Sequence, residues 1–536
     1  MHIKSNYSLF FILVSISIFL NYYFAPIGID LYHDGTQAKS SFDLYNGKIP
    51  YLETYVEYGA LTLYFNSIFL KIFGTELIVL KYLAGFYNFL LHMTFYSFCY
   101  LFFKNIKIAF CLTLSLILFE NYMDVNYFDI SNTHLTILLF MMSVLSFYCF
   151  IRFKITFYIY ILSFLLTLSF FNKINYAVYS YIAFSIIFIL CNFNEGFYNN
   201  DKNLFLNFKD NLFKRFSLRF QISFSIFFLI LIFILISKGV FKDWFIQTFI
   251  NSIGVASSSR PFPQLLLELF PIPFIARQNP LYNYIYFIAA ISYIPFLIKN
   301  TKIFLKKKYL DDHNFEIFTL SILALFLHLN YNPIIDTWHF YWSSPLLLFF
   351  IYLLIDKITN ILNINFLKIK LFIYFLILIP AFIFLLYKTY INKLVNEYTI
   401  ITDINFLNGM KVKKYEYNFF NEINQEFQTN SGLSETNYIV DLTRYPKSFF
   451  LAMFHKKETQ KFYFDYKTIS NNGFYYDNYE DYLKDFIIKY NPIIISENSH
   501  IPSYVNQEYK LIKINSMDEY YKLKPGNNFD IFVPLK

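Results

Sequence analysis

Apolar runs long enough to cross a membrane recur along this chain of 536 residues, from residue 8 to residue 387, and they restrict what it can fold into. The hydrocarbon core of a bilayer is ~30 Å thick, so a helix needs about 20 apolar residues to cross it. Hydrophobic residues make up 56% of the chain and charged residues only 15%, which is more apolar than a soluble fold requires. The sequence therefore predicts an integral membrane protein.

About eleven segments can be read as membrane spans, which gives a polytopic α-helical membrane domain over residues 1–387. The first run, residues 8–25, follows Lys4 but lacks a small-residue cleavage site. It is also longer and more aromatic than the core of a signal peptide, so we expect it to remain as the first span. The other expected spans are residues 77–103, 108–120, 132–151, 155–171, 174–192, 220–238, 281–298, 316–330, 344–355 and 371–387.

An inside N-terminus explains where the basic residues lie. With that orientation every loop expected on the cytoplasmic side carries Lys or Arg, as the positive-inside rule requires. An odd number of spans then places the first outer loop and residues 388–536 on the extracytoplasmic side of a multi-pass cell (inner) membrane protein. The net charge of +8 is thus a topology signal and predicts no nucleic-acid partner. All four cysteines fall within expected spans, so the exported parts have no thiol for a disulfide.

The composition becomes mixed and polar from residue 388 onward, where strand and helix patterns alternate. Strand-like stretches occur near residues 437, 461, 492, 509 and 529, and a helical pattern covers 478–490. Residues 388–536 are thus predicted to form a small extracytoplasmic α/β domain with its own core. The region has no sequence resembling a nucleophile elbow or a phosphate loop. We interpret it as an accessory domain that closes over a site or helps to hold an acceptor.

The first outer loop, residues 26–76, is the least apolar part of the first hundred residues. Asp34 and Gln37 have the spacing of a capping box, and Gly47 is a typical helix stop, so a short helix is expected over 35–46. Asp34 would be its N-cap, where backbone N–H groups would keep the carboxylate ionised and could also face a phosphate. The loop gathers the polar side chains of Asp30, His33, Asp34, Asp43, Glu53 and Glu57.

An apolar pattern with helical period follows in the same loop. Apolar residues recur at i, i+3, i+4, i+7, i+8 and i+11 from Leu61 to Ile72 and end at Gly74, which predicts an amphipathic helix on the outer membrane surface. The parts come in a definite order: a short N-terminal span, His-Asp-Gly, Asn-Gly-Lys-Ile-Pro-Tyr, Glu-Tyr-Gly and a surface helix ending in Phe-Gly. This order resembles the GT-C superfamily of integral-membrane glycosyltransferases, in particular bacterial members related to protein O-mannosyltransferases and aminoarabinose transferases. The resemblance is most specific over residues 26–74 and only architectural in the C-terminal region.

The resemblance implies an enzyme that transfers a sugar from a polyprenyl-phosphate carrier to an envelope lipid, glycan or protein on the outer face of the membrane. By resemblance the catalytic acidic residue is Asp34, with Asp30 as the alternative. The chemistry agrees, because an acceptor hydroxyl needs a carboxylate to take its proton, and a direct displacement inverts the anomeric carbon. One base suffices since the lipid phosphate is already a competent leaving group, unlike in glycoside hydrolysis. The other interpretation is that Asp34 only caps a helix.

Other outer segments contain candidates for binding the substrates. A loop between the third and fourth spans carries carboxylates and a histidine beside aromatic residues, although a plain solvated loop would look the same. A lysine in the turn 172–175 could neutralise a phosphate or could snorkel to the interface, and the proline-rich segment 238–280 holds two arginines. An Asp-x-x-His pair before the tenth span resembles an element of the bacterial relatives, or belongs to an aromatic belt. The expected substrate-binding residues are His33, Glu57, Asp124, Asp129, His134, Lys173, Arg260, Arg277, Asp336 and His339.

No cofactor is certain from the sequence, and a divalent metal is possible. No ligand spacing is fixed, although hard or borderline ligands are present at Asp30, Asp34, Asp124, Asp129 and His339. The rival functions are a transporter or flippase, or a polymerase or ligase, of lipid-linked saccharides. Transporters place ionisable side chains in the middle of spans, whereas here these gather at the outer boundary and only His92 lies clearly inside a span. That distribution favours the enzyme.

Overall fold

Each of the eleven expected spans coincides with a helix in the computed structural model. The model describes residues 2–31, 33–54, 56, 59–120, 130, 133–194, 216–250, 280–307, 309–329, 337–364, 366–385, 397–429, 438–441, 449, 453, 458–459, 479–496, 509–512 and 530–534. The helices are α1 (His2–Phe24), α4 (Leu77–Phe103), α5 (Ile106–Glu120), α6 (Thr133–Phe153), α7 (Phe157–Phe170), α8 (Ile174–Phe193), α9 (Phe216–Ser237), α13 (Pro280–Lys307), α14 (Asp312–Leu329), α15 (Thr337–Ile361) and α16 (Leu367–Leu385). Among the described residues, α4, α6, α8 and α9 are long and apolar enough to cross a membrane on length and composition alone. The chain therefore has the helices of a membrane protein, and the count of eleven spans stays a prediction.

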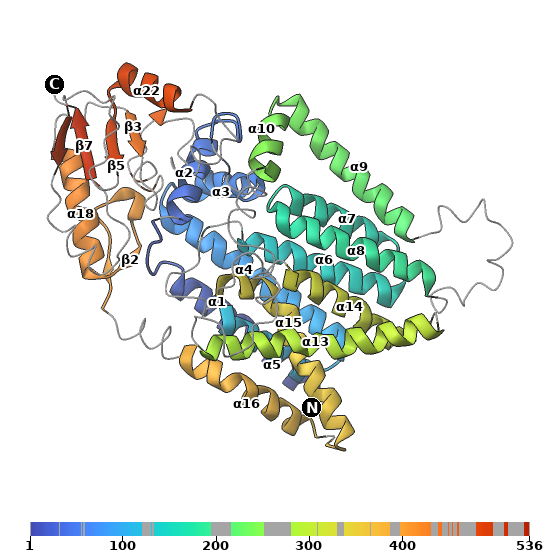
Figure 1. Cartoon of the computed structure of the whole chain (residues 1–536). Helices are drawn as coiled ribbons and strands as arrows, with labels where there is room; N and C mark the ends of the chain where they lie inside the picture. The colour runs from blue at the N-terminus through green and yellow to red at the C-terminus, as the bar shows by residue number, and fades with distance from the viewer. Residues whose placement is uncertain are drawn as a thin grey trace.

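The long helices pack into one bundle, with α6 inside it and α9 at its edge (Figure 1). In the apolar window of α6, 89% of the residues are buried, against 22% in that of α9. Because α9 is apolar all round, its exposed Phe233 and Ile234 suit a lipid environment. In the interior, the rings of Phe102 and Phe349 meet edge to face with their centroids 4.8 Å apart and hold α4 against α15.

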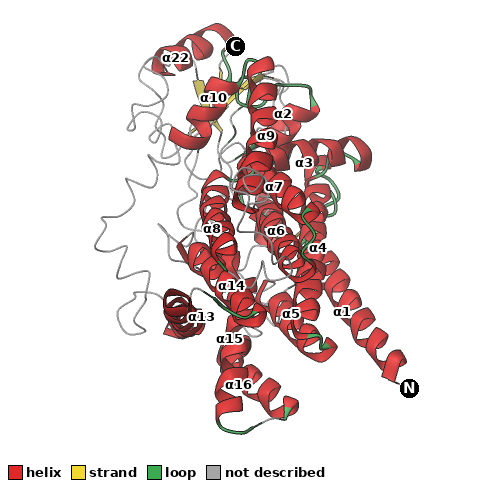
Figure 2. Ribbon diagram, turned by 90° about the vertical axis from the view of Figure 1, so that its right-hand side faces the viewer, coloured by secondary structure: helices red, strands yellow, loops and turns green. Residues whose placement is uncertain are grey.

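Basic residues near one end of the bundle pair with acids on neighbouring helices. Arg152 of α6 lies 3.5 Å from Glu316 of α14, and Lys370 of α16 lies 2.7 Å from Asp356 of α15. Helix α16 lies at the end opposite to the C-terminus (Figure 2). This arrangement agrees with the charge bias read from the sequence, while the side that faces the cytoplasm is still an expectation.

His92, near the middle of α4, and His328, near the end of α14, are both buried in the bundle. His92 Nδ1 lies 2.7 Å from Ser17 Oγ and joins α4 to α1. His328 is buried in α14, with its ring centroid 6.0 Å from that of Tyr293. His328 is the last but one residue of α14, so it lies at a helix end, and the expectation that only His92 lies clearly inside a span is not contradicted.

The first outer loop begins with α2 (His33–Tyr45), which matches the helix expected over 35–46. Gly47 follows it with φ +88°, a left-handed conformation that favours glycine, so the expected stop is confirmed. The helix starts two residues early, however, and Asp34 lies in its first turn rather than at the N-cap. One oxygen of its carboxylate contacts Lys81 of α4 instead.

The second helix of the loop, α3 (Ala60–Phe73), is amphipathic as expected, with its polar side turned inward. Its buried side chains include Thr62, Asn66 and Ser67, and its exposed ones include Tyr64, Phe65, Ile68 and Ile72. Asn66 donates to Ser41 of α2 at 2.9 Å, which satisfies part of this buried polar side. Helix α3 projects sideways from the bundle (Figure 2). An apolar face turned outward suits a membrane surface rather than water, and contact with the membrane remains a prediction.

The C-terminal region forms a hairpin, a mixed sheet and flanking helices. The hairpin pairs β1 (Thr399–Ile400) with β2 (Lys411–Val412), and α18 (Lys414–Thr429) follows it. The sheet has the order β4-β3-β5-β7-β6, in which β3 is parallel to β4 and β5, while β7 is antiparallel to β5 and β6. Its elements are β3 (Tyr438–Asp441), β4 (Glu458–Thr459), β5 (Ile493–Ser496), β6 (Tyr509–Ile512) and β7 (Asp530–Pro534), with α22 (Tyr479–Tyr490) as a further helix.

The strands expected near residues 437, 492, 509 and 529 and the helix over 478–490 are confirmed as β3, β5, β6, β7 and α22. The strand expected near 461 lies outside the described residues. The hairpin and α18 were not expected from the sequence.

The C-terminal region and the first outer loop share one hydrophobic core. Phe42 of α2 meets Phe406 edge to face with ring centroids 5.7 Å apart. The Gly28 N–H donates to Lys411 O at 2.8 Å, and the Lys411 N–H donates to Pro26 O at 2.7 Å, so β2 extends along the start of the loop. Both regions therefore lie at the same end of the molecule (Figure 1), in agreement with the expected placement of both outside. The division into domains at 387/388 stays a prediction.

Candidate active site in the first outer loop

The centre of the candidate site is an ion pair between Asp34 of α2 and Lys81 of α4. Asp34 Oδ2 lies 2.5 Å from Lys81 Nζ, and neither side chain is exposed. The same oxygen accepts the Asp30 N–H at 2.9 Å. Two charges can be removed from water only when each is paired, so the carboxylate and the ammonium must be kept together for the loop to keep this position.

Asp30 differs from Asp34 in its exposure. Its residue is half-buried, while Asp34 is fully buried, and Asp30 O accepts the Asp34 N–H at 3.0 Å. A general base must come within hydrogen-bonding distance of the hydroxyl it deprotonates. Exposure therefore favours Asp30 for contact with a substrate and Asp34 for holding the charge of Lys81.

A metal at this point would compete with the lysine. Asp34 Oδ2 already carries an ammonium at 2.5 Å, so a cation bound there would have to displace Lys81. Within the described part of the chain, no group of three or more His, Cys, Asp or Glu side chains has a metal-binding arrangement. The side chains of Asp124, Asp129 and His339, which were also expected as possible ligands, lie outside the described residues, and we derive no chemical step through a cation.

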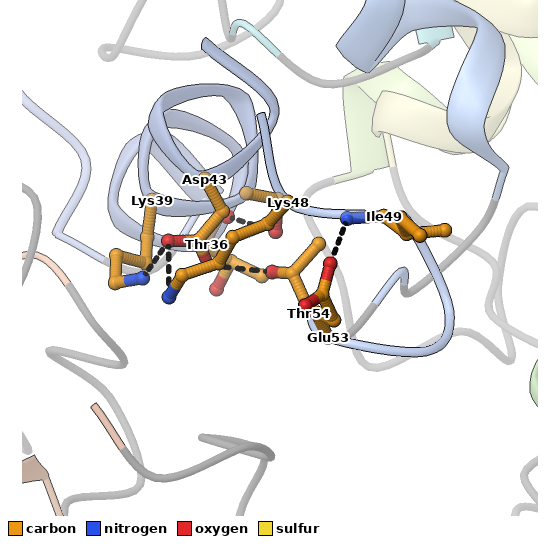
Figure 3. A network of polar contacts seen from close by, with 8 residues as sticks. Thr36, Lys39, Asp43, Lys48, Ile49, Glu53 and Thr54 are labelled. Carbon is orange, nitrogen blue, oxygen red and sulfur yellow. Dashed lines mark hydrogen bonds and ion pairs between the residues drawn. The ribbon is translucent and has the colours of Figure 1, made fainter. Parts of the chain in front are cut away.

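A second charge cluster surrounds Asp43 at the other end of α2 (Figure 3). Asp43 Oδ1 lies 2.5 Å from Lys39 Nζ and 3.1 Å from Lys48 Nζ, and its Oδ2 accepts the Thr54 hydroxyl at 2.7 Å. Burial alone would raise the pKa of Asp43, but the two ammonium groups and the bonds from Lys39 and Thr54 hold that pKa below its ordinary value. The Asp43 cluster therefore fixes the end of α2 to residue 54 with an ionised carboxylate.

The N-terminus of α3 is closed by acceptors from other parts of the chain. The Ala60 N–H donates to the Tyr51 hydroxyl at 3.0 Å, and the Leu61 N–H donates to Phe171 O at 3.2 Å. The Thr62 N–H and hydroxyl donate to Asn172 Oδ1 at 3.2 and 2.7 Å. A helix N-terminus can bind a phosphate only when its N–H groups are free, so this one does not offer such a site.

Close approach of two loops sets the position of this helix. A Cβ added at Gly59 would lie 2.4 Å from Asn172 O, which no real side chain tolerates. Gly59 has φ −174°, an ordinary extended conformation, so the glycine is required here by space and not by its backbone angles. Asn172 Nδ2 also donates to Thr136 of α6 at 2.8 Å, and thereby joins the loop to the bundle.

Lys173 and His134 are brought close together beside this contact. Lys173, in the turn between α7 and α8, is 3% exposed, and its Nζ donates to Thr133 Oγ1 at 3.3 Å. His134 follows in the first turn of α6 and is also buried. A snorkelling lysine keeps its ammonium in water, so the burial of Lys173 does not fit that alternative. Contact of Lys173 and His134 with a substrate stays a prediction.

Most other expected site residues fall where no contact can be described. His33 and His339 lie in α2 and α15, but only their backbones are described. Six more lie outside the described residues, namely Glu57, Asp124, Asp129, Arg260, Arg277 and Asp336.

Three residues that organise the site were missed from the sequence: Lys81, Asn172 and Gln247. Lys81 had a signal, because it is a cation at the outer end of a span, the same anomaly that identified Lys173. Asn172 and Gln247 are neutral residues whose partners in the first outer loop lie more than a hundred positions away, and no local pattern identifies such contacts.

No protein-family model matches this sequence, and no curated protein matches it. The fold, in contrast, is similar to solved structures, among them the oligosaccharyltransferase of Archaeoglobus fulgidus in its apo form. The match covers 92% of this chain and 69% of that chain, with a TM-score of 0.50 and 12% sequence identity. At this identity the likeness establishes the fold alone. The GT-C-like fold expected from the first outer loop is thereby confirmed, and the narrower bacterial subfamily remains untested.

Proposed function

We propose that the protein is a glycosyltransferase that moves a sugar from a polyprenyl-phosphate carrier to an envelope lipid, glycan or protein on the outer face of the cell membrane. The observation that carries the proposal is the buried pair between Asp34 of the first outer loop and Lys81 of α4, in a fold similar to that of an oligosaccharyltransferase. A fold alone permits many activities, so the proposal depends on the carboxylates that this loop provides.

The reaction needs one base and one leaving group. The acceptor oxygen attacks the anomeric carbon while its proton passes to a carboxylate, and the bond from that carbon to the carrier phosphate breaks with the electron pair leaving on the phosphate. The half-buried Asp30 is suited to take the proton, with Asp34 as the alternative base. When Asp34 stays paired with Lys81, it acts as the fixed charge that positions α2. Direct displacement inverts the configuration at the anomeric carbon of the sugar.

The test compares purified wild-type protein with the Asp30→Asn and Asp34→Asn variants. The measurement is release of polyprenyl phosphate from several polyprenyl-phosphate hexoses, with a crude envelope preparation as the acceptor. We expect release by the wild type and a loss of about 100-fold or more in the variant that lacks the base. Glu53→Gln serves as the matched control, because Glu53 is an exposed carboxylate of the same loop.

The pattern of loss assigns the roles. Loss in Asp30→Asn with a folded protein assigns the base to Asp30, and loss only in Asp34→Asn assigns it to Asp34. Equal release by both variants and the wild type contradicts a catalytic role for this pair. Absence of release by the wild type with every donor contradicts the proposed function and favours a transporter.

A further inference from the structure

We propose that Gln247 is a positioning residue that fixes residues 51–60 of the first outer loop to the outer segment following α9. Gln247 belongs to η2 (Ile246–Ile250), a single π-helical turn directly after α10 (Phe241–Phe245). Figure 1 shows α10 beside α3. The structural part of this inference is independent of the proposed function, and only its catalytic consequence rests on that function.

The Gln247 amide uses both of its ends on the backbone of the loop. Its Nε2 donates to Tyr51 O at 2.9 Å, and its Oε1 accepts the Val56 N–H at 3.1 Å. The side chains of all three residues are almost completely buried. A buried backbone group left without a partner is costly, and this one glutamine satisfies two such groups of the loop.

The residue held by this amide has a strained backbone. Tyr51 has φ +69°, a left-handed conformation that costs a side-chain-bearing residue about 1–2 kcal/mol. Such conformations persist only where the surroundings over-determine them. Here the Tyr51 N–H donates to Thr54 O at 3.0 Å, its carbonyl accepts from Gln247, and its hydroxyl accepts the Ala60 N–H. Gln247 thus holds the residue that closes the N-terminus of α3.

The hydrogen bonds around Tyr51 extend through Thr54 to the Asp43 cluster. Thr54, whose carbonyl accepts the Tyr51 N–H, donates its hydroxyl to Asp43 Oδ2 at 2.7 Å. A shift of Tyr51 would therefore disturb hydrogen bonds in two directions, toward α2 through Thr54 and toward α3 through Ala60. Both of these hydrogen bonds of the Gln247 amide go to backbone atoms and neither goes to a carboxylate, so we assign Gln247 a positioning role and not a catalytic one.

The anchoring side is itself rigid. Trp244 of α10 is almost completely buried, and its ring meets that of Phe249 at 5.4 Å, nearly edge to face. Trp244 belongs to the same small hydrophobic cluster as Tyr51 and Val56. The turn that carries Gln247 is therefore packed against the loop that it holds, and a substitution at 247 removes the hydrogen bonds while this packing remains.

The test measures hydrogen exchange by mass spectrometry on the full-length protein in detergent, in peptides that cover residues 51–60. Gln247→Met keeps the length of the side chain and removes both hydrogen bonds. Gln247→Glu keeps the acceptor for Val56 and removes the donor to Tyr51. Gln221→Met is the matched control, because Gln221 also bonds at both ends, to Ser185 and Tyr181, but within the bundle. Thermal unfolding establishes that each variant is folded.

We expect exchange of residues 51–60 to become at least tenfold faster in Gln247→Met and to stay unchanged in Gln221→Met. In the transfer assay we expect kcat to fall about tenfold in Gln247→Met while the pH dependence of the remaining activity stays that of the wild type. Unchanged exchange in Gln247→Met overturns the inference, whatever the activity does. Faster exchange with full activity overturns the positioning role. If the wild type itself transfers no sugar, the proposed function fails, and the exchange comparison still decides whether Gln247 holds the loop.

Discussion

Asp34 and Lys81 form a fully buried ion pair that joins the first outer loop to α4, with 2.5 Å between carboxylate oxygen and ammonium nitrogen. A buried pair of this kind need not add net stability over an apolar pair. Removal of one partner, however, leaves an uncompensated charge in a medium that cannot solvate it. The contact therefore makes the position of the loop depend on both residues at once.

Asp34→Asn should lower the free energy of unfolding by about 3–5 kcal/mol, because the buried ammonium of Lys81 would lose the carboxylate oxygen that lies 2.5 Å from it. Lys81→Met should cost a similar amount, and the double variant should recover most of the loss. The measurement is thermal or denaturant unfolding in detergent for the four proteins. Additive effects in the double variant would show that the two groups are not coupled.

Gly59→Ala should destabilise the protein more than Gly47→Ala. At Gly59 the new methyl group would lie 2.4 Å from Asn172 O, so the backbones of two loops would have to separate. At Gly47 nothing lies within 4 Å, and the cost is only the strain of φ +88°, about 1–2 kcal/mol. Unfolding midpoints of the two variants, compared with the wild type, test this order. A neutral Gly59→Ala would contradict the close approach of the loops.

The contribution of Asp43 to stability should depend on pH. Since the folded-state pKa of Asp43 is lowered, its ionised form contributes stability that is fully present above the unfolded pKa of ~3.9 and is lost as the pH falls through the folded value. The difference in melting temperature between wild type and Asp43→Asn should thus be large at pH 7 and shrink below about pH 4. A difference in melting temperature that stays constant between pH 7 and pH 3 would contradict this prediction. Glu53→Gln is the control, because Glu53 is exposed.

The outward face of α3 should contact lipid. Ile68 and Ile72 are 49% and 65% exposed, although both are apolar. A fluorophore on Ile68→Cys or Ile72→Cys should be quenched by brominated lipid in reconstituted vesicles, whereas one on Glu53→Cys should not. Of the native cysteines, Cys99, Cys149 and Cys191 are buried and Cys111 is half-buried, so unsubstituted protein sets the background. Quenching at positions 68 and 72 that is no stronger than at position 53 would contradict contact of α3 with lipid.

Periodicity and composition predicted most of the fold. The positions of the helices follow from runs such as 77–103, which the structure reproduces as α4 residue for residue. Gly47 and Gly74 marked the helix ends of the loop because their left-handed backbones exclude most other residues. The hairpin β1–β2 escaped prediction, since strands of two residues have no period to detect.

The site was predictable in its location but not in its pairing. Clustered carboxylates identified the first outer loop. The capping-box spacing predicted Asp34 to be an N-cap within its own helix, whereas its partner Lys81 lies 47 positions away on α4. Local rules describe the contacts of a residue within its own helix. A buried charge is stabilised instead by the opposite charge that the tertiary fold places beside it. The contacts of Gln247 with Tyr51 and Val56 are likewise products of tertiary packing.

The pairing of β2 with the start of the first outer loop has a consequence for biosynthesis. Pro26 emerges from the ribosome early, but its hydrogen-bond partner Lys411 is made roughly 400 residues later, after a delay of about 20–80 s. Until then the first outer loop lacks the C-terminal part of the hydrophobic core that the two regions share. The candidate site thus reaches its final setting only after the last part of the chain has been made, and a truncated product would lack that part of the core.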